Sequence, residues 1–98
     1  MPYFLSEEAE DDLLEISIQG YERFGPHQAQ RYQDELLRIF GLIATTPEMG
    51  KRSKEFSTDI TQAYTHPHKP YLIVYKIHED REVEILTLVP ARTDWKKS

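Results

Sequence analysis

Two segments in the last third of the chain alternate in the way that β-strands do. They cover residues 71–78 and 82–89, and the short turn Glu79-Asp80-Arg81 joins them, which predicts a β-hairpin. One face carries Tyr71, Ile73, Tyr75, Ile77, Val83, Ile85, Thr87 and Val89, and the other carries Leu72, Val74, Leu86 and Leu88. Near one end, both faces are apolar. Because a single layer of helices covers only one face of a sheet, the second face is expected to be covered by a partner.

Two helices are predicted ahead of these strands. Ser6 is a suitable N-cap for the first, which opens with an acidic, solvated turn and runs to about Phe24. The pair Gly25-Pro26 ends that helix and opens a second one, which continues to about Thr46. The short junction predicts an antiparallel helical hairpin. The second helix has one apolar sector, formed by Ala29, Tyr32, Leu36, Ile39, Phe40 and Ile43.

The first helix differs from the second because it carries two apolar stripes. The main stripe consists of Ala9, Leu13, Ile16, Gly20 and Phe24, and the second of Leu14, Ile18 and Tyr21. Two stripes indicate that the helix is contacted from two directions. We interpret this as a helix wedged between the sheet and the second helix. An intermolecular surface on the second stripe is the alternative.

The remaining segments complete one domain over residues 1–98. Residues 2–5 form a short apolar run that predicts an opening strand, and residues 51–61 are polar and predict a surface loop. Residues 62–68 predict a further strand that lies at a sheet edge or bends early, because Pro67 and Pro70 remove donors from the ladder. The order strand, helix, helix and three strands predicts an α+β fold, in which a helical hairpin packs on one face of an antiparallel sheet.

Charge and composition exclude several classes of protein. The net charge is −5, which disfavours capture of nucleic acid by the molecule as a whole, so no direct DNA binding is expected. There is no cysteine, which excludes disulfides and thiolate chemistry and fits a cytoplasmic location. The first residues lack the basic flank and long apolar stretch of a signal peptide or membrane span.

The sequence offers little catalytic chemistry. His66 and His68 lie at strand spacing around Pro67, but no third ligand accompanies them, so no metal site is predicted. His27 and His78 are expected at solvent positions. No phosphate-binding loop or nucleophile motif is present, so no catalytic residue and no cofactor is predicted.

The C-terminal tail carries the most suggestive polar residues. Arg92, Lys96 and Lys97 surround Trp95 in an otherwise acidic chain. Arginine and tryptophan are the residues that most often supply binding energy at interfaces. Lys51, Arg52 and Lys54 add cations in the middle of the chain, and they are expected to lie near the tail if the loop that carries them folds over the sheet. A solubilising terminus is the alternative to a binding segment.

Several pieces of the chain together resemble the ParE branch of the RelE/ParE toxin superfamily, bacterial toxins of type II toxin–antitoxin pairs. The pieces follow the family's order over nearly the whole chain, and each alone is weak. They are residues 5–13, 21–26, 28–32, 36–37, 44–52, 71–77 and 83–86. The resemblance implies the fold already predicted, strand, two helices and three strands.

The superfamily divides into two activities. The resemblance implies either a ribosome-dependent mRNA endonuclease, as in RelE-like members, or a non-enzymatic inhibitor of DNA gyrase, as in ParE-like members. Where the family commonly has His-x-Arg after the last strand, this chain has Pro90-Ala91-Arg92, and proline cannot transfer a proton. Tyr64 stands where many relatives carry an arginine. These departures and the acidic charge favour gyrase inhibition. A degenerate member that binds its antitoxin without toxicity stays open.

The resemblance also implies partners. A cognate ParD-like antitoxin, itself DNA-binding, would fold its disordered C-terminal segment onto the toxin, and the apolar sheet face suits such coupled folding. The residues expected to contact the antitoxin are Leu72, Val74, Leu86, Leu88 and Tyr71, and the opposite face of the hairpin is the alternative. Arg92 is expected at the target interface from its match to the family arginine. Trp95, Lys96, Lys97 and Arg52 are added from their chemistry alone.

Overall fold

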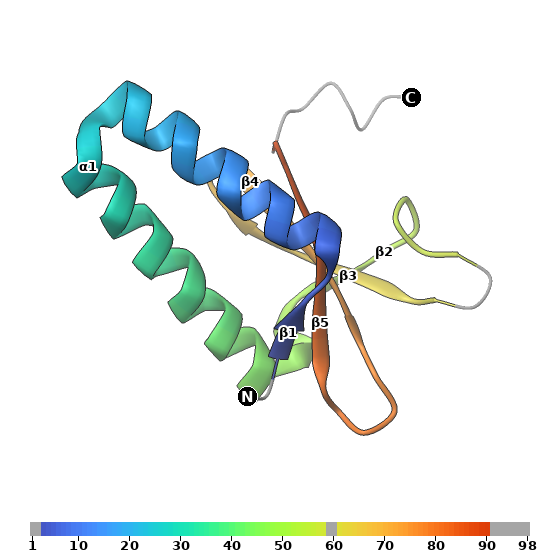
Figure 1. The fold of residues 1–98 in the computed structure, drawn as a ribbon. Coiled ribbons are helices and arrows are strands. Elements are labelled where there is room, and N and C mark those ends of the chain that lie inside the picture. The colour runs from blue at the N-terminus through green and yellow to red at the C-terminus, as the bar shows by residue number, and fades with distance from the viewer. Residues whose placement is uncertain (1–2, 59–60, 91–98) are drawn as a thin grey trace.

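The computed structural model describes residues 3–58 and 61–90, which form a bent helix packed on one face of a five-stranded sheet (Figure 1). The strands are β1 (Tyr3–Leu5), β2 (Lys51–Ser53), β3 (Ala63–His68), β4 (Tyr71–Ile77) and β5 (Val83–Pro90). The helix α1 spans Glu7–Thr45, and a short 3-10 helix, η1 (Pro47–Met49), follows it. The fold is α+β with an open sheet, which confirms the predicted class.

Helix α1 consists of two legs that meet at Gly25. This residue has φ 88° and ψ 169°, a conformation that glycine adopts without the steric cost of a Cβ. Pro26 then opens the second leg, where its missing N–H is not needed. At the start of the helix, the Ser6 hydroxyl accepts from the Ala9 N–H at 3.0 Å. The predicted cap and helical hairpin are therefore confirmed. No helix in residues 3–58 and 61–90 is long and apolar enough to cross a membrane.

The sheet is mixed, with the strand order β1-β5-β4-β3-β2. Strand β1 runs parallel to β5, and the other neighbours are antiparallel. The expectation of a wholly antiparallel sheet is therefore wrong at β1. Side chains alternate in the same way in both kinds of strand, so the sequence pattern does not carry strand direction.

The segment predicted as a surface loop contains a strand. Lys51–Ser53 form β2, which pairs with residues 63–65 at one edge of the sheet. Its three residues are too few to show a period, and two of them are charged, as is common on edge strands. Pro67 lies beyond the end of β2. Among residues 3–58 and 61–90, no strand pairs with the outer side of β3 at this point, so the predicted edge position of this part of β3 is confirmed.

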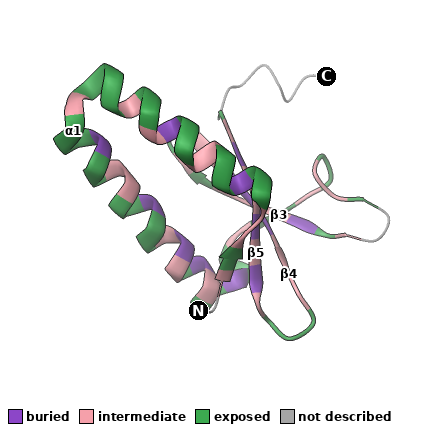
Figure 2. Ribbon diagram, viewed as in Figure 1, coloured by how far each residue is buried: buried purple, intermediate pink, exposed green. Residues whose placement is uncertain are grey.

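The hydrophobic core lies between α1 and the sheet (Figure 2). Its largest fully buried side chains from the helix are Leu36, Phe40 and Ile43, and those from the sheet include Ile73, Tyr75 and Ile85. Residues of β4 with odd numbers face this core, as the alternation predicts. The buried positions of the second leg match its predicted apolar sector.

Tyr75 ties the core to the turn that follows α1. Its hydroxyl donates to the Pro47 carbonyl at 2.6 Å and accepts from the Gly50 N–H at 3.0 Å. The Tyr64 ring stacks on it with 5.7 Å between centroids. Two backbone groups of the turn thus depend on one buried hydroxyl.

The Tyr75 hydroxyl predicts a loss of stability in alkali. Burial is the main cause that raises its pKa from 10.0 to about 12, so the folded state holds the proton more tightly than the unfolded chain does. This share of the stability is intact below pH 10 and is lost as the pH rises through about 12. We expect a loss of about 2–3 kcal/mol in the free energy of unfolding across that range. Urea titrations of the wild type and of Tyr75→Phe measure it. The variant should show a shallower alkaline decline, and equal slopes would contradict this prediction.

Candidate binding surfaces

Strand β5 changes its register partway along. Tyr75 pairs with Ile85 and Val74 pairs with Thr87, so Leu86 is an extra residue without a partner. This β-bulge reverses the faces of all later residues. Leu88 therefore packs in the core beneath α1 with 5% of its surface exposed. The predicted position of Leu88 on the uncovered face is wrong, because strict alternation fails at a bulge.

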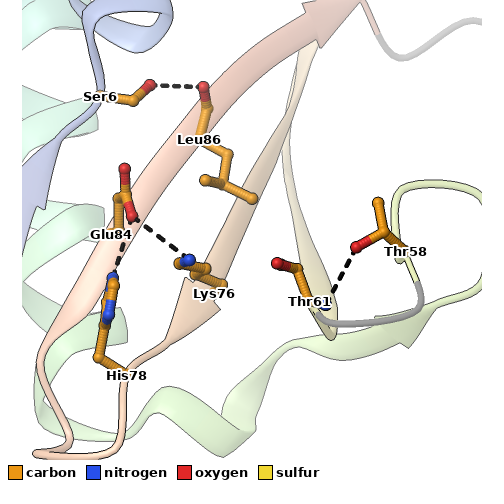
Figure 3. Close-up of polar contacts among 7 residues, drawn as sticks. All are labelled: Ser6, Thr58, Thr61, Lys76, His78, Glu84 and Leu86. Carbon is orange, nitrogen blue, oxygen red and sulfur yellow. Dashed lines mark hydrogen bonds and ion pairs between the residues drawn. The ribbon is translucent and has the colours of Figure 1, made fainter.

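Helix α1 closes the edge of β5 that β1 leaves open. The Ser6 hydroxyl donates to the Leu86 carbonyl at 2.7 Å (Figure 3). Farther along, the Asp12 carboxylate accepts from the Leu88 N–H at 3.0 Å and from the Thr87 hydroxyl at 2.5 Å. Asp12 therefore has a structural role that its place in a solvated acidic turn does not predict. Backbone groups that would otherwise recruit another strand are occupied.

The apolar residues on the sheet face away from α1 are less exposed to solvent than the sequence predicts. Val74 is buried, with 1% of its surface exposed, and Leu72 and Leu86 are half-buried. Tyr71 lies on the other face, where it packs against the core beside Tyr32. The five residues expected to contact an antitoxin are therefore divided between the two faces. Their role in binding stays a prediction.

A polar cluster occupies the far face next to these apolar residues. The Glu84 carboxylate lies 2.9 Å from the His78 ring nitrogen and 3.9 Å from the Lys76 ammonium (Figure 3). The ring of Phe4 lies 5.5 Å from that of His78. His78 pairs with Glu84 in this cluster and keeps 35% of its side chain exposed, so it is only partly at the solvent position that the sequence predicts. The charges separate the apolar patch from the hairpin turn at this end of the sheet.

The most exposed apolar residues lie on the first leg of α1. Leu14, Ile18 and Tyr21 are 62%, 48% and 60% exposed, and Phe24 is 63% exposed. In Figure 2, exposed residues recur along this leg between buried and half-buried ones. The predicted wedge is therefore wrong, because the sheet and the second leg contact the first leg from the other side. The second stripe was the signal of this exposed surface in the sequence, because its residues are not part of the core.

The predicted target-binding residues are mostly beyond the described part of the chain. Arg92, Trp95, Lys96 and Lys97 lie outside the described residues. Arg52 is exposed on β2, where its guanidinium donates to the Gln62 side chain at 3.0 Å. It therefore stands at the outer edge of the sheet. Its expected proximity to the tail falls outside what the structure describes.

The histidines of β3 pack as part of the protein. His68 stacks on Tyr32 with 5.2 Å between ring centroids, and its Nε2 lies 3.7 Å from the Glu35 carboxylate. Burial lowers the pKa of His66, and His68 lowers it further. Within residues 3–58 and 61–90, no group of three or more possible ligands could hold a metal ion.

Comparison with known proteins identifies the family. Residues 3–95 match the model of the ParE toxin of the type II toxin–antitoxin system parDE, and the chain belongs to this family. A solved structure described as the chromosomal ParDE TA system from P. aeruginosa is similar, with a TM-score of 0.72 and 15% identity. The match covers 94% of this chain and 97% of that one, and at this identity it shows the shared fold. No curated protein sequence matches the chain.

Proposed function

We propose that this ParE-family protein is a toxin that inhibits DNA gyrase by binding and that a cognate antitoxin neutralises it. The observation that carries the proposal is the family match over residues 3–95. The end of β5 supports binding rather than catalysis, because Pro90, exposed beside Tyr71, cannot act as a general acid or base. The proposed activity is therefore adhesion to a target and not cleavage of RNA.

The apolar surfaces support the antitoxin as a partner. The stripe of Leu14, Ile18 and Tyr21 is exposed, and large exposed apolar side chains in a row are typical of interaction sites. An antitoxin segment that folds on binding gains stability by covering such a stripe. Leu72 and Leu86 offer a second, half-buried patch on the other side of the sheet. We propose the stripe on α1 as the principal contact and this patch as the secondary one.

Expression in bacterial cells tests the function. A gyrase inhibitor is expected to stop growth, to induce the DNA-damage response and to leave transcripts intact. Purified protein should also inhibit supercoiling by gyrase, and the antitoxin should restore it. Cleaved transcripts on programmed ribosomes would instead establish an mRNA endonuclease. Normal growth with a tight antitoxin complex would establish a degenerate member of the family.

Deletion of residues 92–98 is expected to abolish toxicity while antitoxin binding survives. The deletion removes all four tail residues predicted to contact the target, whereas the apolar stripe on α1 remains. Growth assays measure the toxicity, and calorimetry with purified antitoxin measures the binding. Arg31→Gln, which removes an exposed cation from α1, serves as the control and should stay toxic. Toxicity that persists after the deletion would exclude the tail as the target-binding segment.

A further inference from the structure

The exposed apolar stripe on the first leg of α1 is surrounded by negative charge. With 3.6 residues per turn, Leu14, Ile18 and Tyr21 fall within about 60° of arc. Five exposed carboxylates lie on the same side of the helix, within about 100° of Leu14, namely Glu7, Glu10, Asp11, Glu15 and Glu22. Arg23, the one cation between residues 7 and 24, lies about 180° from Leu14 and lines a hollow that reaches Tyr71 of β4. The outer face of this leg is therefore apolar along its middle and acidic around it.

These five carboxylates are not neutralised within the described structure. Among residues 3–58 and 61–90, the acidic members of the ion pairs are Glu35, Glu48 and Glu84. The Glu15 carboxylate accepts a hydrogen bond from the Gln19 side chain at 3.2 Å, and this donor is neutral. The negative charge beside the stripe is therefore left for a partner to balance.

Helix stability explains these charges only in part. A carboxylate in the first turn is stabilised by the helix dipole, which accounts for Glu7 and Glu10. Glu15 and Glu22 lie beyond that turn. Glu7, Asp11 and Glu15 also follow one another at a spacing of four residues, and like charges at this spacing destabilise a helix. The row is thus unfavourable in the free protein, and a cationic partner would relieve it.

Charge distinguishes between the possible occupants of this face. A second copy would bring an equal set of carboxylates against it, and an anionic membrane surface would also be repelled. An amphipathic helix with basic residues beside its apolar positions matches both the stripe and the acidic surroundings. The face extends over about 22 Å from Glu7 to Glu22 at 1.5 Å per residue, so a helix of about four turns covers it.

We propose that the stripe and the five carboxylates form a docking site for a basic amphipathic helix of a partner protein, about four turns long. Apolar side chains of that helix, spaced three and four residues apart, cover Leu14, Ile18 and Tyr21. Its lysines or arginines face the carboxylates. The assignment of this helix to the antitoxin rests on the proposed function, whereas the docking site depends only on the face of α1.

Fluorescence anisotropy with three labelled peptides of about 18 residues, or five turns, tests the site. The first peptide has leucines at spacings of three and four residues and lysines elsewhere. The second has glutamates in place of the lysines, and the third has the composition of the first in scrambled order. We expect the first peptide to bind about tenfold more tightly than the scrambled one, and the glutamate peptide not to bind. Added salt should weaken the binding of the first peptide.

Ile18→Ser tests the apolar part of the site. It should weaken binding of the first peptide about fivefold to tenfold, because a side chain that is 48% exposed in the free protein would no longer be covered by leucine. Leu42→Ser is the matched control. Leu42 is 44% exposed on the second leg, outside the stripe, and its replacement should leave the affinity unchanged.

A triple variant tests the charged part of the site. Asp11→Asn, Glu15→Gln and Glu22→Gln together should weaken binding about tenfold and make it nearly independent of salt. The matched control removes the same number of exposed carboxylates elsewhere, with Asp34→Asn, Glu55→Gln and Glu79→Gln. It should retain the wild-type affinity within about twofold. Circular dichroism of all variants establishes that each is folded.

Several outcomes would overturn the docking site. Equal losses in the stripe variants and their controls would do so, as would a scrambled or glutamate peptide that binds as tightly as the first. Self-association in sedimentation velocity that Ile18→Ser abolishes would assign the stripe to a second copy. Binding to phosphatidylcholine–phosphatidylglycerol vesicles that Ile18→Ser abolishes would assign it to a membrane. Selective peptide binding together with unaffected gyrase would refute the proposed function and leave the docking site intact, so the two failures are distinguishable.

Discussion

Leu88→Asp is expected to unfold the protein, whereas Leu86→Asp should leave it folded. Leu88 lies in the core with 5% of its surface exposed, and its own N–H donates to the Asp12 carboxylate. A second carboxylate there would be buried, unpaired and close to a like charge, which costs about 4 kcal/mol or more. Small domains have only about 5–15 kcal/mol of stability in total. Leu86, the extra residue of the bulge, is half-buried and lies outside this core, so a carboxylate can stay hydrated.

Urea denaturation followed by circular dichroism measures both variants. The pair is informative because strict alternation along residues 82–89 gives Leu86 and Leu88 the same environment. Similar losses of stability in the two variants would therefore contradict the bulge. Leu86→Asn is a useful control, since it removes the apolar side chain without adding charge. The folded Leu86 variants then allow antitoxin affinity to be measured on the far face of the sheet.

Gly50→Ala is expected to cost about 3 kcal/mol, although the backbone there is ordinary, with φ −81°. The reason is space. A Cβ at this residue would lie 2.2 Å from the Tyr75 hydroxyl oxygen and 2.8 Å from the Thr65 carbonyl oxygen. Tyr75 is fully buried, so it cannot move aside without leaving the Pro47 carbonyl and the Gly50 N–H unpaired. Thermal and urea unfolding of the variant measure the loss.

A double-mutant cycle with Tyr75→Phe isolates the cause of this loss. Removal of the hydroxyl alone leaves two turn groups without their partner and should cost about 1–3 kcal/mol. In the double variant the closest clash is absent, so the combined loss should be smaller than the sum of the single losses. Strict additivity would show that the hydroxyl is not what excludes a side chain. Gly41→Ala is the matched control, because nothing lies within 4 Å of a Cβ there.

Much of the fold could be predicted because its signals are local. The Ser6 cap, the break at Gly25-Pro26 and the strands of the C-terminal hairpin each depend on neighbouring residues. The β2 strand could not be predicted, since three residues are too short for a period and its ladder is formed with residues ten or more positions away. The parallel pairing of β1 with β5 joins residues about eighty positions apart, and no local pattern encodes it.

The candidate surfaces could be predicted only in part. The second apolar stripe of the first helix was visible, but assigning it to the core or to the surface requires knowing where the second leg packs. The faces of β5 could be predicted up to Ile85 and not beyond, because the bulge depends on how β5 fits against β4. From the sequence alone, Asp12 is interpreted as a solvated acid. Its role as an acceptor becomes apparent only in the fold, where the edge of β5 lies beside it.

The class of fold, the bend between the two helical legs, the alternating strands and the likeness to the ParE family could all be inferred from the sequence. Each of these features depends on particular residue types at fixed spacings along the chain. Which apolar residues are exposed to solvent depends on the tertiary structure alone. Burial of a side chain depends on which distant segments of the chain pack against it. Leu88 therefore lies in the core and Leu14 lies on the surface, although both are leucines in periodic apolar stretches.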